Sequence, residues 1–127
     1  MLVADYYTIL HTDIADGTGT FRLALQPGCA VYEGHFPGEP VCPGVCNIQM
    51  LKECLETLLG RRCRLSAIRQ CRLTTLVTPV QHHEIEAVVR ILSEEDGQLT
   101  FQAHIGKGGD VYLDLKADAV YADANPA

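Results

Sequence analysis

The chain contains 127 residues, of which 47% are hydrophobic and 20% charged. This balance is typical of a single globular domain over 1–127 and unlike that of a disordered chain. A formal net charge of −6 offers no overall positive field for nucleic acid, and the apolar runs are far shorter than the ~20 residues of a membrane span. The N-terminus lacks the basic region of a secretory signal and carries Asp5, so we expect a cytoplasmic protein.

Alternating apolar and polar residues predict six β-strands, two near the N-terminus and four in the second half of the chain. Two turn signals between them, Asp16-Gly17 and Asp96-Gly97, are typical of tight hairpins. The expected strands cover residues 6–14, 17–25, 65–77, 84–92, 99–105 and 111–119.

A single long helix is expected between the second and third strands. The segment before it, 27–43, is too rich in proline and glycine to be regular. Over 45–59 apolar residues recur with a helical period, and Gly60 suits the position just after a helix. Because the apolar face of this helix is wide, it must be largely covered. The patterns predict an α+β fold in which one curved antiparallel sheet wraps around the helix.

Three residues around the helix start could carry chemistry. His35 lies in a stiff loop and is the side-chain type best suited to move protons near neutral pH. Gly44 stands where the helix should begin, and free backbone N–H groups at such a point can stabilise an oxyanion. Gln49 lies one turn further, on an inward side where a polar group needs a partner.

The stretch that joins these residues is more specific than any of them alone. Residues 34–45 read GHFPGEPVCPGV. This string resembles the signature of the β-hydroxyacyl-acyl-carrier-protein dehydratases, a hot-dog-fold family. The N-terminal strands, the helix length and the strand after the helix also fall where that family would have them. The hot-dog fold is the helix-in-sheet layout that the periodicity predicts independently.

The resemblance implies a homodimer, or a larger assembly of dimers, with active sites at the subunit interface. His35 of one subunit would be the base that removes the α-proton of a 3-hydroxyacyl thioester, and the Gly44 N–H would stabilise the enolate. The acyl chain would lie in an apolar tunnel, with Phe36, Pro43 and Val45 contacting substrate. The partner that delivers the substrate would be an acyl carrier protein, and no metal or nucleotide cofactor is implied.

Gln49 departs from the family's pattern, which has Glu or Asp at this helix position. An amide can hold a hydroxyl or a water but has no proton to give. In one alternative, His35 serves as both base and acid. In a second, Glu53 supplies the acid, because it lies four residues on and therefore on the same helical face; the family often has Gln near that position. In a third, the chain is a non-catalytic subunit that binds acyl groups or pairs with an active homologue.

Basic residues cluster between Lys52 and Arg72, a stretch that holds six of the chain's ten lysines and arginines. Scattered arginines usually form an ordinary solvated surface. Because the family's substrates arrive on an acidic carrier protein, the resemblance favours Arg61, Arg62 and Arg64 as a docking patch.

The cysteines and one asparagine are interpreted structurally. The six cysteines include no CxxC pair, and their spacing is unlike that of structural zinc sites, so neither disulfides nor a metal are predicted. We expect most of them to be buried thiols. Asn47 is expected to satisfy backbone groups near the helix start.

The sequence therefore predicts a dehydratase that converts 3-hydroxyacyl thioesters to trans-2-enoyl thioesters in fatty-acid or related polyene synthesis. A thioesterase on the same fold is one alternative, although Gln49 would be a poor base for activating water. A non-catalytic acyl-binding or partner subunit is the other.

Overall fold

The strands of one antiparallel sheet come from both sides of a single helix in the sequence. The computed structural model describes residues 6–26, 28–29, 44–79 and 81–122. Its elements are β1 (Tyr7–Ala15), β2 (Thr18–Leu25), α1 (Gly44–Leu59), β3 (Cys63–Leu73), β4 (Glu84–Glu95), β5 (Gln98–Lys107) and β6 (Asp110–Tyr121). The strands are ordered β1-β2-β4-β5-β6-β3, and every neighbouring pair is antiparallel.

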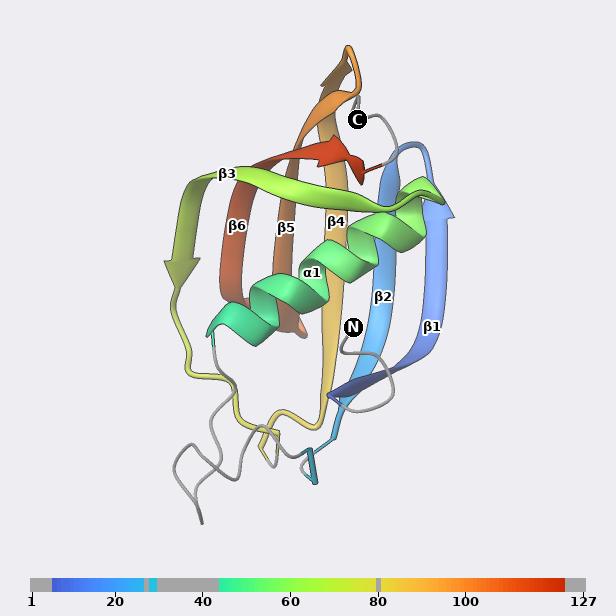
Figure 1. The fold of residues 1–127 in the computed structure, drawn as a ribbon. Helices are drawn as coiled ribbons and strands as arrows, with labels where there is room; N and C mark the ends of the chain where they lie inside the picture. The colour runs from blue at the N-terminus through green and yellow to red at the C-terminus, as the bar shows by residue number, and fades with distance from the viewer. Residues whose placement is uncertain (1–5, 27, 30–43, 80, 123–127) are drawn as a thin grey trace.

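The helix lies in the hollow of this sheet (Figure 1). Met50, Leu51 and Leu55 of α1 are completely buried, and they belong to the same core cluster as Leu23 of β2 and Phe101 of β5. Burying such side chains contributes roughly 1.5–3 kcal/mol each. The predicted order of elements and the curved sheet around one helix are confirmed.

Alternation along β4 shows why the sheet has one dry face. Ile85, Ala87 and Val89 are buried, whereas Glu84 and Glu86 between them are exposed. Since successive residues of a strand point to opposite faces, the apolar set faces the helix and the charged set faces solvent.

The end of α1 is tied directly to the start of β3. Gly60 has a φ of 69°, a left-handed conformation that glycine adopts at little cost, and its N–H donates to the carbonyl of Glu56 at 2.9 Å. The Glu56 side chain in turn accepts the backbone N–H of Cys63 at 2.9 Å and lies 3.5 Å from the Lys52 ammonium. The predicted helix end at Gly60 is confirmed.

Strand β3 is shorter than predicted: it ends at Leu73, not at residue 77. The N–H groups of Thr74 and Thr75 both donate to the Tyr112 carbonyl, at 2.9 and 3.3 Å. A regular β-ladder pairs each backbone donor with its own acceptor. Because two N–H groups share one carbonyl here, the pairing of β3 with β6 ends at this point. Val77, counted as strand from its alternation, is nevertheless buried, which is why its apolar character misled the prediction.

Within the part of the chain that is described, no helix has the length and apolar character needed to cross a membrane.

Candidate functional site

The site residues expected from the sequence divide between described and undescribed parts of the chain. His35, Phe36 and Pro43 lie outside the described residues. Gly44 is the first residue of α1, as expected, and Val45 follows it with 75% of its surface exposed. An apolar side chain this exposed at the helix start is available to contact another molecule.

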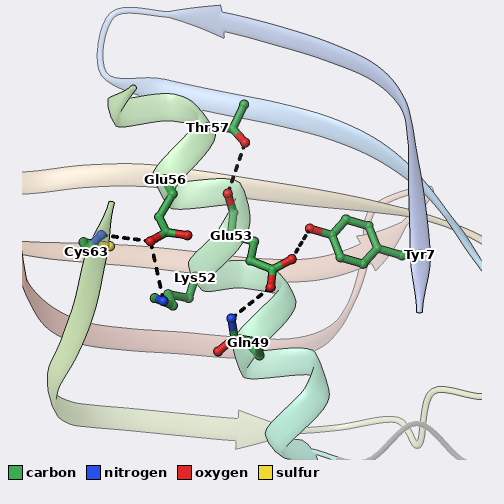
Figure 2. Close-up of polar contacts among 7 residues, drawn as sticks. All are labelled: Tyr7, Gln49, Lys52, Glu53, Glu56, Thr57 and Cys63. Carbon is green, nitrogen blue, oxygen red and sulfur yellow. Dashed lines mark hydrogen bonds and ion pairs between the residues drawn. The ribbon is translucent and has the colours of Figure 1, made fainter. Parts of the chain in front are cut away.

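Gln49 and Glu53 share one face of α1, as their four-residue spacing predicts. The Gln49 amide donates from Nε2 to Glu53 Oε2 at 2.9 Å. Glu53 is only 8% exposed, and a carboxyl taken out of water needs such partners. Gln49 and this carboxyl are therefore in direct contact (Figure 2).

Tyr7, at the start of β1, supplies the second partner of Glu53. Its hydroxyl donates to Glu53 Oε1 at 2.8 Å, so a donor from a different element lies on each carboxyl oxygen (Figure 2). Burial, followed by the hydrogen bond to Glu53, raises the pKa of Tyr7 above its ordinary value. Tyr7 consequently keeps its proton and remains a donor at any working pH.

Reasoning from sequence missed Tyr7, although one signal was present. Two adjacent tyrosines, Tyr6 and Tyr7, stand at the start of the first expected strand. A buried tyrosine usually needs a partner for its hydroxyl, so the pair pointed to polar groups inside the core. Which groups these are depends on contacts across 41 and 46 residues.

Asn47 does not serve the helix backbone in the way expected. It is 1% exposed, and its Oδ1 accepts the hydroxyl of Tyr6 at 2.9 Å. The expectation was wrong because a side chain that faces the sheet can reach the strand, and a buried tyrosine hydroxyl needs an acceptor there.

A cavity of about 410 Å³ borders the Glu53 carboxyl. Its walls come from β1 (Tyr7 and Ile9), the second half of α1 (Glu53 and Thr57) and the turn after α1 (Arg61 and Arg62). Glu56 and Gly60 also line it, so two acidic and two basic side chains share the cavity with the apolar side chain of Ile9.

The three predicted docking arginines lie close in sequence but differ in environment. Arg61 stacks over the Tyr121 ring with its guanidinium carbon 3.6 Å from the ring centroid, and it lines the cavity with Arg62. Arg64 is exposed on the edge strand β3 and is not part of the cavity wall.

The cysteines of the described segments are thiols in varied environments. Cys54 and Cys63 are buried, Cys29 and Cys46 are half-buried, and Cys71 is exposed. None of these five forms a disulfide. In those same segments no three His, Cys, Asp or Glu side chains gather closely enough to hold a metal ion.

Comparison with known proteins assigns the chain to a family. A family model described as ApeI-like, for the ApeI dehydratase, matches residues 11–114. The chain belongs to this dehydratase family. It is 26% identical to the 3-hydroxyacyl-[acyl-carrier-protein] dehydratase FabZ of Lactiplantibacillus plantarum, over 90% of this chain and 86% of that protein.

Solved structures agree on the fold. The Dehydratase Heterocomplex ApeI:P from Xenorhabdus doucetiae matches with a TM-score of 0.67 at 23% identity, covering 89% of this chain and 96% of that one. An HP0420 homologue from Helicobacter felis matches with a TM-score of 0.68 at 10% identity, covering 91% and 88%. The predicted hot-dog fold is confirmed.

We predict that Cys54 and Cys63 resist alkylation in the native protein at pH 8. Burial raises the pKa of Cys54 to about 12 and that of Cys63 to about 11. The thiolate is the nucleophile, so only about one thiol in a thousand or fewer is reactive at that pH. Iodoacetamide labelling read peptide by peptide should show at least ~100-fold slower modification of both than in urea-unfolded protein. Equal rates in the two states would contradict the burial.

Proposed function

We propose that this protein dehydrates 3-hydroxyacyl thioesters carried on an acyl carrier protein, giving trans-2-enoyl thioesters, and that Glu53 is its general acid. The observation that carries the proposal is the buried Glu53 carboxyl, one helical turn beyond the family's acid position and bonded to the residue that replaces the acid. Membership of the ApeI-like dehydratase family supports the reaction class.

The proposed reaction uses one base and one acid. His35 takes the α-proton, and the electrons of the broken C–H bond move toward the thioester carbonyl, whose oxygen the Gly44 N–H stabilises. The C–O bond at the β-carbon then breaks as Glu53 gives its proton to the leaving hydroxyl, which departs as water. The double bond forms between the α- and β-carbons. Transfer of a proton from His35 back to Glu53 through solvent restores both groups.

Gln49 has a supporting role in this scheme. Its amide has both a donor and an acceptor end, and rotation exchanges them. It can therefore donate to a Glu53 oxygen, as it does at 2.9 Å, or accept a hydrogen bond from the carboxyl O–H when Glu53 is neutral. Gln49 can also hold the substrate hydroxyl near the acid.

We also propose a homodimer whose two active sites each combine His35 of one subunit with Gly44 and Glu53 of the other. The edge strand β3 supports it. Among the strands of the described segments β3 pairs only with β6, and its residues Ile68 and Leu73 are 51% and 48% exposed. Unpaired edges with apolar side chains favour pairing with another chain.

The acyl chain would lie in a tunnel between these subunits, in contact with Phe36, Pro43 and Val45. The exposed Val45 side chain supports this assignment. A cytoplasmic location belongs to the same proposal, and the absence of disulfides among the five described cysteines is consistent with it.

A non-catalytic partner subunit is the second candidate, and Gln49 is the observation that favours it, because this chain lacks an acid where the family has one. The two candidates differ in whether the purified protein alone turns over substrate.

We predict that Glu53→Gln lowers kcat for dehydration by about 10²–10⁴-fold, since general acid catalysis typically contributes that much. His35→Ala should abolish the activity. Enoyl formation and free thiol release from a 3-hydroxyacyl carrier substrate would be followed together. Glu86→Gln is the matched control, because Glu86 is an exposed carboxylate on the outer face of β4, and its activity should equal that of wild type.

Each other outcome identifies an alternative. Full activity in Glu53→Gln with none in His35→Ala would mean that His35 acts as both base and acid. Thiol release without enoyl product would indicate a thioesterase. Neither signal from the wild-type protein would indicate a non-catalytic subunit.

We predict that mixing His35→Ala and Glu53→Gln subunits restores activity. In a mixed dimer one shared site would have both defects and the other would have none. Random exchange should therefore recover about one quarter of the wild-type rate. Unfolding and refolding the two variants together, compared with each alone, would measure this. No recovery, with mixed dimers confirmed by native mass spectrometry, would mean that each site lies within one subunit.

We predict that reversing the charge of Arg64, which is exposed and not part of the cavity wall, weakens the binding of carrier-bound substrate alone. Rim charges act mainly on encounter with a charged partner, so KM for the carrier substrate should rise by about tenfold at low salt. A short free thioester should be unaffected. Arg90→Glu, an exposed residue on β4, is the matched control. Equal loss on both substrates would argue against docking.

A further inference from the structure

We infer that Tyr7 is a positioning residue for the acid, holding the Glu53 carboxyl from β1 while Gln49 holds it from within α1. The inference rests on the proposed role of Glu53, although its central measurement does not require catalysis.

The geometry leaves Glu53 little freedom. The Tyr7 hydroxyl lies 2.8 Å from Oε1 and the Gln49 amide nitrogen lies 2.9 Å from Oε2. Tyr7 is 1% exposed and part of the hydrophobic core, so its ring cannot move without disturbing the packing around it. Figure 2 shows the two donors approaching the carboxyl from different elements. The acid is thereby oriented relative to the sheet as well as to its own helix.

Among the described residues, the other titratable groups recorded near Tyr7 and the cavity lie on α1 or in the turn after it. Cys54 and Glu56 of α1 interact electrostatically with Tyr7, as Glu53 does. Arg61 and Arg62 line the cavity that the carboxyl borders. Of these groups, Tyr7 is the one bonded to the carboxyl from β1, so its removal should alter the acid most selectively.

The chemistry gives the Tyr7 bond a purpose. When Glu53 passes its proton to the leaving hydroxyl, negative charge develops on the carboxyl oxygens. A donor already in place stabilises that charge without having to reorganise, and it binds the carboxylate better than the neutral acid. The Tyr7 bond thus becomes stronger as the proton departs.

The test is Tyr7→Phe, which removes only the hydroxyl, with Tyr6→Phe as the matched control. Tyr6 is the neighbouring buried tyrosine, and its hydroxyl donates to Asn47 rather than to Glu53. Loss of a donor to the ionised carboxylate favours the protonated acid. The alkaline limb of kcat, where activity falls as the acid loses its proton, should therefore move to higher pH by about one pH unit. At its optimum, kcat should fall about tenfold. Tyr6→Phe should leave the pH limb in place.

A second measurement separates failure of this inference from failure of the proposed function. The carboxyl carbon signal of Glu53, followed by NMR against pH in carbon-labelled protein, should titrate at higher pH in Tyr7→Phe than in wild type. An unchanged titration would overturn the inference, whatever the activity shows. A shifted titration together with full activity in Glu53→Gln would support the effect of Tyr7 on the Glu53 carboxyl but would overturn the proposal that Glu53 is the general acid.

If Tyr7→Phe fails to fold, a substitution that strengthens the Tyr7 hydrogen bond tests the same inference, because its expected effect on the Glu53 titration is opposite. Replacing Tyr7 alone with 3-fluorotyrosine retains the ring and makes the hydroxyl a stronger donor. The titration of Glu53 and the alkaline limb should then both move to lower pH. Movement in the other direction, or none, would overturn the inference.

Discussion

The enclosure of one helix by one sheet is the constraint on which the rest of this molecule depends. With Met50, Leu51, Cys54 and Leu55 completely buried, the side of α1 that faces the sheet has little surface that water can reach. A polar side chain on such a helix must find its partner in the sheet or on the helix itself. Glu53 meets this requirement with Tyr7 and Gln49 together. The candidate site is thus a direct consequence of how the core is closed.

The same constraint bears on the proposal that Glu53, and not residue 49, supplies the acid. Residues four apart lie one above the other on a helix face, so Gln49 and Glu53 are neighbours and contact each other. Exchanging an amide and a carboxyl between two such positions preserves the contact while displacing the acid by about 6 Å along the axis. In this chain the Glu53 carboxyl has a further partner on β1, the Tyr7 hydroxyl.

Local sequence patterns were enough to predict most of the fold but only part of the candidate site. Alternation along β4 and the glycine after α1 can be recognised in the sequence because burial and helix termination depend on neighbouring residues. The contact between Gln49 and Glu53 was predictable for the same reason. The Tyr7 bond was not, because it joins residues 46 apart and depends on how the sheet curls around the helix. The end of β3 escaped prediction because two donors compete for the Tyr112 carbonyl, which no alternation pattern encodes.

The adjacent tyrosines have a mechanical consequence. Tyr6 and Tyr7 are consecutive in the chain, yet their hydroxyls donate hydrogen bonds to Asn47 and Glu53, which are six residues apart on α1. That separation is about 9 Å along the helix axis. The two hydrogen bonds together therefore oppose both translation of the helix along its axis and rotation about it. A shift of α1 by one helical turn relative to β1 would break both hydrogen bonds at once. Tyr6 and the first residue of β1 therefore fix the position of α1 inside the sheet, and the orientation of the Glu53 carboxyl depends on that fixed position.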